Sequence, residues 1–68
     1  MNSNILKGKM REHNLTQSAV AATIGLSLSR FNAKLNNSDG AEFSLGEIRS
    51  LKELFALDSN QVDQIFFS

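Results

Sequence analysis

Short side chains that could contact base pairs stand close together in the middle of the chain. Ser29 and Asn32 can form hydrogen bonds with base edges, and asparagine pairs well with adenine. Leu28 and Ala33 can contact the methyl group of thymine. At helical spacing these four residues fall on one face, where a solvated helix would usually carry Lys and Glu. The spacing therefore predicts an outward strip that meets base pairs.

Six further residues are candidates for contacts with phosphate groups: Thr16, Gln17, Arg30, Lys34, Asn36 and Asn37. The two cations flank the strip and suit phosphate oxygens. The first pair stands where a helix is expected to begin, and free N–H groups and the helix dipole attract an anion there. The two asparagines follow the strip and could donate through their amides.

Two short helices separated by a glycine must position these groups. We predict the first helix over residues 17–24 and the second over residues 28–36. Gly25 suits a left-handed residue that ends the first helix, and the small Ala21 allows the helices to cross closely. The apolar positions on the inner faces are Val20, Ala21, Ile24, Phe31 and Leu35. This layout is typical of a helix-turn-helix, whose second helix enters the major groove of DNA.

The same helix-start signal occurs four times along the chain. An apolar residue precedes a capping residue in the pairs Leu15–Thr16, Leu26–Ser27, Phe43–Ser44 and Leu57–Asp58. Glu47 and Gln61 stand three residues after the last two caps and complete capping boxes. Further helices are expected over residues 4–13, 45–56 and 59–67, with Asn14 ending the first. The fold class is therefore all-α, with five helices in a single domain over residues 1–68.

Composition excludes several classes of site. The chain has no cysteine and one histidine, so we expect neither a disulfide nor a metal centre. No paired acids, serine–base motif or glycine-rich phosphate loop occurs, so we expect no enzyme and no cofactor or small-molecule ligand. No apolar run is long enough to span a membrane, and no secretory h-region is present. We therefore expect a cytoplasmic protein.

The net charge of zero conceals two oppositely charged halves. Residues 1–36 hold five basic and one acidic residue, which gives +4. Residues 37–68 hold two basic and six acidic residues, which gives −4. Such asymmetry indicates that the first half could face a polyanion while the second faces water or a partner.

Residues 15–36, LTQSAVAATIGLSLSRFNAKLN, resemble the helix-turn-helix of lambda-repressor-like, Cro/C1-type regulators. Residues 45–67, LGEIRSLKELFALDSNQVDQIFF, are similar to the last two helices of short Cro-like regulators from phages and prophages of Gram-positive bacteria. The resemblance implies a five-helix DNA-binding domain and a transcriptional repressor in a lysis–lysogeny switch. It also implies base contacts by Leu28, Ser29 and Ala33, with Gln17 as an anchor. The addition of Asn32 comes from helical geometry.

Two other interpretations stay open. The paired helices could be an αα-hairpin within a small bundle. The domain could also be a protein-binding module, such as an antirepressor, since the second half is acidic and ends in two phenylalanines.

For the regulator we expect double-stranded operator DNA as partner and a homodimer at least on DNA. Two-fold symmetric readers bind half-sites about 34–36 Å apart. The candidate dimer contacts are Leu57, Ile65 and Phe67.

Overall fold

Amphipathic segments separated by capping residues form the whole architecture. The computed structural model describes residues 1–67, and within these residues it contains five α-helices and no strand. The helices are α1 (Ser3–Glu12), α2 (Gln17–Thr23), α3 (Leu28–Leu35), α4 (Leu45–Leu54) and α5 (Ser59–Val62). Two short turns complete the order, the 3-10 turn η1 (Ser38–Gly40) and the π-type turn η2 (Asp63–Phe67). The expected all-α class is confirmed.

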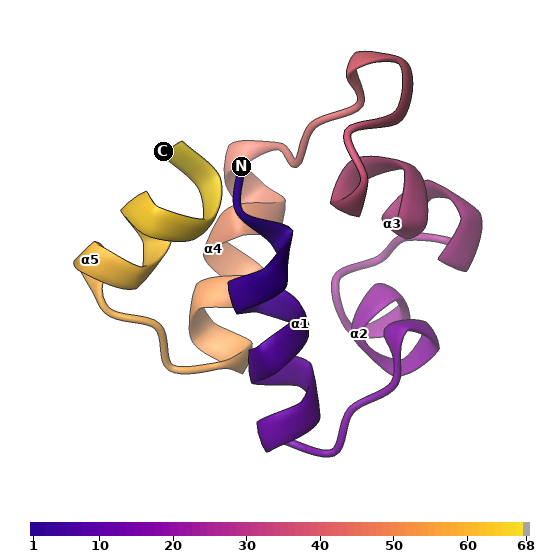
Figure 1. Cartoon of the computed structure of the whole chain (residues 1–68). Coiled ribbons are helices and arrows are strands. Elements are labelled where there is room, and N and C mark those ends of the chain that lie inside the picture. The colour runs from indigo at the N-terminus through magenta and orange to yellow at the C-terminus, as the bar shows by residue number, and fades with distance from the viewer. Residues whose placement is uncertain (68) are drawn as a thin grey trace.

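The helices surround one apolar core. Figure 1 shows α1 and α4 in the middle, α2 and α3 on one side and α5 on the other. The buried side chains are Leu6, Met10, Val20, Ala21, Phe31, Leu35, Phe43, Leu51, Phe55, Leu57 and Ile65. Phe31 and Phe43 pack their rings 5.7 Å apart, which joins α3 to the segment before α4. No helix of the described residues is long and apolar enough to cross a membrane.

Side-chain caps begin all five α-helices. The capping oxygens of Asn2, Thr16, Ser27, Ser44 and Asp58 accept backbone N–H groups at 2.8–3.2 Å. Both expected capping boxes are present, because Glu47 and Gln61 accept in return the N–H groups of their own caps. The predicted starts at residues 17, 28, 45 and 59 are confirmed, since each cap satisfies a donor that the helix leaves free.

One turn is used three times to pass from helix to helix. Asn14, Gly25 and Ala56 take the left-handed conformation, with φ of 54°, 79° and 51°. The next residue, a leucine each time, donates its N–H back to a carbonyl five residues earlier at 2.9 Å. These are Schellman motifs that end α1, α2 and α4. The leucine then precedes the next capping residue, so the same residue closes the end of one helix and stands directly before the N-cap of the next.

Helix ends differ from the prediction more than helix starts do. The first three helices each end one residue early, because His13, Ile24 and Asn36 act as C-caps. α4 ends two residues early because Ala56 turns left-handed, a conformation that alanine seldom adopts.

The prediction of an α-helix over residues 59–67 is wrong beyond Val62. The chain continues there as the wider turn η2. The Ile65 carbonyl of this turn accepts the N–H of Asn2 at 2.8 Å, which ties the two ends of the chain together. Figure 1 shows the N- and C-termini side by side. This contact joins residues that are far apart in sequence, so local pattern does not predict it.

Candidate nucleic-acid interface

The packing of α2 against α3 determines which face of α3 is free. Val20 and Ala21 of α2 are buried, and so are Phe31 and Leu35 of α3. Between the helices the turn closes through the N–H of Leu26, which donates to the Ala21 carbonyl at 2.9 Å. These contacts direct the inner face of α3 to the core and leave the opposite face outward.

The outward face of α3 carries the four predicted base-contacting residues. Leu28 is 43% exposed and Ser29 is exposed, while Asn32 and Ala33 are half-buried. Among the described residues, neither the Ser29 hydroxyl nor the Asn32 amide takes part in a hydrogen bond. α5 lies on the opposite side of α1 and α4 (Figure 1), so it does not cover this face. The four residues therefore lie on one face of α3, and the side-chain polar groups of Ser29 and Asn32 are free to bind a partner.

Five of the six predicted phosphate-contacting residues are accessible to solvent. Arg30, Asn36 and Asn37 are exposed, and Gln17 is half-buried at the start of α2. The Thr16 oxygen caps α2 by accepting the N–H of Ala19 at 3.1 Å, which leaves its hydroxyl hydrogen free to donate. These five positions can hydrogen-bond phosphate oxygens without disturbing the helices.

Lys34 is not the free cation that the sequence predicts. Its Nζ donates to both carboxylate oxygens of Glu47, at 2.7 and 2.9 Å. The two side chains are only 15% and 16% exposed. Because the ammonium group is held by a carboxylate, we no longer assign Lys34 a phosphate contact.

Glu47 joins α3 to the start of α4. Burial by itself would raise the pKa of the Glu47 carboxyl, but hydrogen bonds from Lys34 and from the Ser44 backbone, together with the charge of Lys34, lower it overall. The carboxylate therefore stays charged while it caps α4 and holds the C-terminal end of α3. Sequence analysis identified the capping role but missed the ion pair, since residues 34 and 47 meet only in the tertiary structure.

Three of the basic side chains in residues 1–36 form no ion pair within the part of the chain that the structure describes. Lys9 lies 3.5 Å from Glu12 in a helical ion pair, and such exposed pairs are weak. No ion pair within residues 1–67 involves Lys7, Arg11 or Arg30. The basic half therefore offers three unpaired side chains.

The expected dimer contacts require correction. Leu57 and Ile65 are 4% and 0% exposed and belong to the core of the chain. Leu57 is buried because it closes the turn between α4 and α5, and Ile65 because η2 packs against α1. Only Phe67, which is 61% exposed, is available to a partner.

Comparison with models of known protein families, with curated proteins and with solved structures gave no match to this chain.

Proposed function

We propose that this chain is a sequence-specific DNA-binding regulator with a lambda-repressor-like helix-turn-helix, formed by α2 and α3. The observation that carries the proposal is the outward face of α3, where Ser29 and Asn32 are free of partners on a helix that the core holds in place. Recognition helices expose such a face so that it can enter the major groove. The function is that of a phage-type, Cro-like repressor acting on operator DNA.

Each residue of the interface has a distinct role in this proposal. Ser29 and Asn32 read base edges, and Leu28 and Ala33 contact thymine methyl groups. Phosphate contacts come from five residues: Thr16, Gln17, Arg30, Asn36 and Asn37. Phosphate contacts position the protein and base contacts specify the sequence. Two copies on a two-fold operator would occupy half-sites about 34–36 Å apart.

The test begins with the selection of a binding sequence from random double-stranded DNA at low salt. Footprinting titrations on the selected duplex then compare the chain with Ser29→Ala and Asn32→Ala. Each variant should lose about 1–3 kcal/mol of specific binding, since a base contact is removed while the helix stays capped and packed. Binding to unrelated duplex should change little.

Matched controls are Ser59→Ala and Asn60→Ala, which change the same residue types at exposed positions of α5. They should bind as the parent chain does. The proposal is wrong if no sequence is enriched while circular dichroism shows a helical chain. Equal footprints for the parent and both α3 variants would also contradict it.

A further inference from the structure

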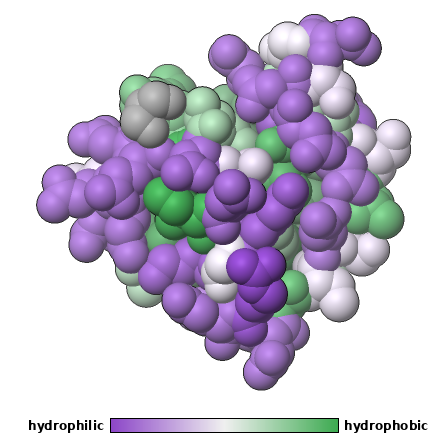
Figure 2. Space-filling view, viewed as in Figure 1, coloured by the Kyte–Doolittle hydropathy of each residue, from purple (hydrophilic) through white to green (hydrophobic). Residues whose placement is uncertain are grey.

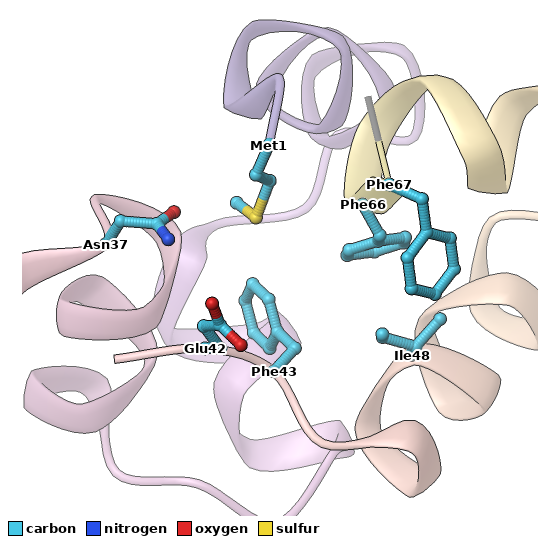
Figure 3. Close-up of a pocket in the computed structure, with 7 residues that line it drawn as sticks. All are labelled: Met1, Asn37, Glu42, Phe43, Ile48, Phe66 and Phe67. Carbon is cyan, nitrogen blue, oxygen red and sulfur yellow. The ribbon is translucent and has the colours of Figure 1, made fainter. Parts of the chain in front are cut away.

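A small cleft opens where the two ends of the chain meet the segment before α4. It has a volume of about 260 Å³. Its lining residues are Met1, Asn37, Glu42, Phe43, Ile48, Phe66 and Phe67. Figure 3 shows Met1 pointing into the cleft from one side, Phe66 and Phe67 from another, and the Glu42 carboxylate beside the Phe43 ring. Five of the seven residues are apolar.

The cleft has an aromatic wall and an exposed apolar rim. The rings of Phe43 and Phe66 pack edge to face with centroids 5.9 Å apart. Met1 and Phe67 are 37% and 61% exposed, although both are large apolar side chains. Leu45 is 76% exposed and precedes Ile48 by three residues, so it extends the same face of α4. Figure 2 shows apolar surface gathered beside the C-terminal end of the chain.

Glu42 carries the one charged side chain among the residues that line the cleft, which also include Met1 with its N-terminal ammonium group. Glu42 is exposed, and its carboxylate has no ion pair or hydrogen bond within residues 1–67. No Lys or Arg side chain lines the cleft. An apolar recess with an unpaired carboxylate at its edge is complementary to an apolar side chain that stands next to a cation.

We propose that this cleft docks a short amphipathic segment of another protein. One large apolar side chain of that segment enters between Met1, Phe43 and Phe66. A neighbouring Lys or Arg pairs with Glu42, and Phe67 closes over the contact. Buried aromatic anchors of this kind carry most of the binding energy in interfaces.

Charge and size argue against other occupants. In a two-fold contact between copies the patch would meet itself, and its lining residues offer neither Glu42 a Lys or Arg side chain. Asn37, which also lines the cleft, is a proposed phosphate contact, but a phosphate group inside the cleft would meet the carboxylate of Glu42. The volume of about 260 Å³ is large enough for one apolar side chain and lies near the lower end of the range of about 300–1,000 Å³ for small-molecule pockets. The proposal does not depend on DNA binding by α3.

The test uses the full chain and random 12-residue peptides displayed for selection. Enriched peptides should share a Lys or Arg beside a Leu, Met or aromatic residue. The chain has no Trp or Tyr, so a tryptophan placed in a synthetic enriched peptide reports binding by its fluorescence without a tryptophan signal from the protein. Backbone amide shifts of the labelled protein should change around the cleft and not on α3.

Variants of exposed residues make the test specific. Phe67→Ser should weaken binding of the selected peptide by about 30-fold, as expected for loss of the large apolar side chain that covers the anchor. Glu42→Lys should weaken it by about 5-fold or more, and a peptide with Glu in place of its cation should recover binding to this variant. Glu53→Lys, an exposed charge reversal elsewhere on α4, is the matched control and should change neither peptide.

Three outcomes would overturn the proposal. The first is a selection that enriches no peptide. The second is an enriched peptide that shifts protein amides outside the cleft, or that binds the parent chain and Glu42→Lys with equal affinity. The third is a dimer in sedimentation experiments that Phe67→Ser disperses, because the cleft would then belong to a second copy of the chain.

Discussion

At the scale of single residues, backbone conformation explains several positions better than side-chain contacts do. Asn14 and Gly25 suit the left-handed conformation that ends their helices. Ala56 adopts the same conformation with φ of 51°, where its Cβ meets the backbone unfavourably. This strain is retained because Leu57, the next residue, is buried and closes the turn.

We expect Ala56→Gly to raise the free energy of unfolding by about 0.5–1 kcal/mol, since glycine removes the strain without changing a contact. Urea denaturation followed by circular dichroism measures it. Ala19→Gly, at an exposed helical position of α2, should instead lower stability by about 1 kcal/mol. A loss of stability in both variants would show that Ala56 is not strained.

The Lys34–Glu47 pair should contribute about 1–2 kcal/mol of coupling, between the values for exposed and buried pairs. A double-mutant cycle with Lys34→Met and Glu47→Gln measures it, because Gln at position 47 can still complete the capping box. The coupling should be absent if the two side chains do not meet in solution.

The same pair predicts a pH dependence of stability. The folded-state pKa of Glu47 is lowered below its ordinary value of 4.5. Its contribution is therefore fully present above that value and is lost as the pH falls through the lowered folded-state pKa. Repeating the cycle at pH 7 and near pH 3 should show the coupling decline on acidification. Coupling that is equal at both pH values would contradict a charged pair.

At the scale of elements, the recurring turn sets the angle between consecutive helices, and three adjacent residues are enough to form it. The left-handed residue ends one helix, the leucine after it is wholly or partly buried, and the next residue caps the following helix. Between α2 and α3 this turn directs Ser29 and Asn32 outward. The candidate interface therefore depends on Gly25 as much as on the residues that would contact DNA.

Substitutions of two glycines test how much the left-handed conformation at Gly25 matters for stability. Gly25 has φ of +79°, and a Cβ added there would meet no atom within 4 Å. Gly25→Ala should therefore cost about 1 kcal/mol of stability from backbone strain alone. Gly8 lies inside α1 with equally open space, so Gly8→Ala should stabilise the chain by about 0.5–1 kcal/mol. Thermal melts of both variants check this, and changes of the same sign would contradict it.

At the scale of the whole molecule, the two halves of the chain differ in charge and in proposed partner. The basic half contains α2 and α3, and the acidic half contains Glu42 and every other residue of the cleft except Met1. The pairing of Lys34 with Glu47 removes one cation from the basic half. A chain of zero net charge should therefore bind DNA with a modest electrostatic contribution.

This predicts a shallow salt dependence. Each neutralised phosphate contributes about −0.9 to the slope of log K against log salt, so Arg30, the one cation among the proposed phosphate contacts, gives about −1 per bound chain, and all three unpaired cations of residues 1–36 give at most about −3. Fluorescence anisotropy of a labelled duplex at several salt concentrations measures it. Glu47→Gln should steepen the slope by about one, because it releases Lys34. A parent slope much steeper than −3 would show that further cations reach the DNA.

The sequence by itself determined four of the five helix starts, the all-α class and most of the core, while α1 begins at Ser3, one residue before the predicted start. Caps, capping boxes and apolar stripes act within a few residues, so their outcome can be predicted without knowing the fold. The same local rules identified the outward position of Ser29, since Phe31 must point inward on the same helix.

Only the tertiary structure decided which exposed groups are free. Leu57 and Ile65 were expected at a dimer contact and are buried, because Leu57 closes the turn between α4 and α5 and η2 packs against α1. Lys34 meets Glu47, and Met1 comes beside Phe66 and Phe67, through contacts between residues distant in sequence. Such pairings depend on how the helices pack, and local propensity carries no information about them.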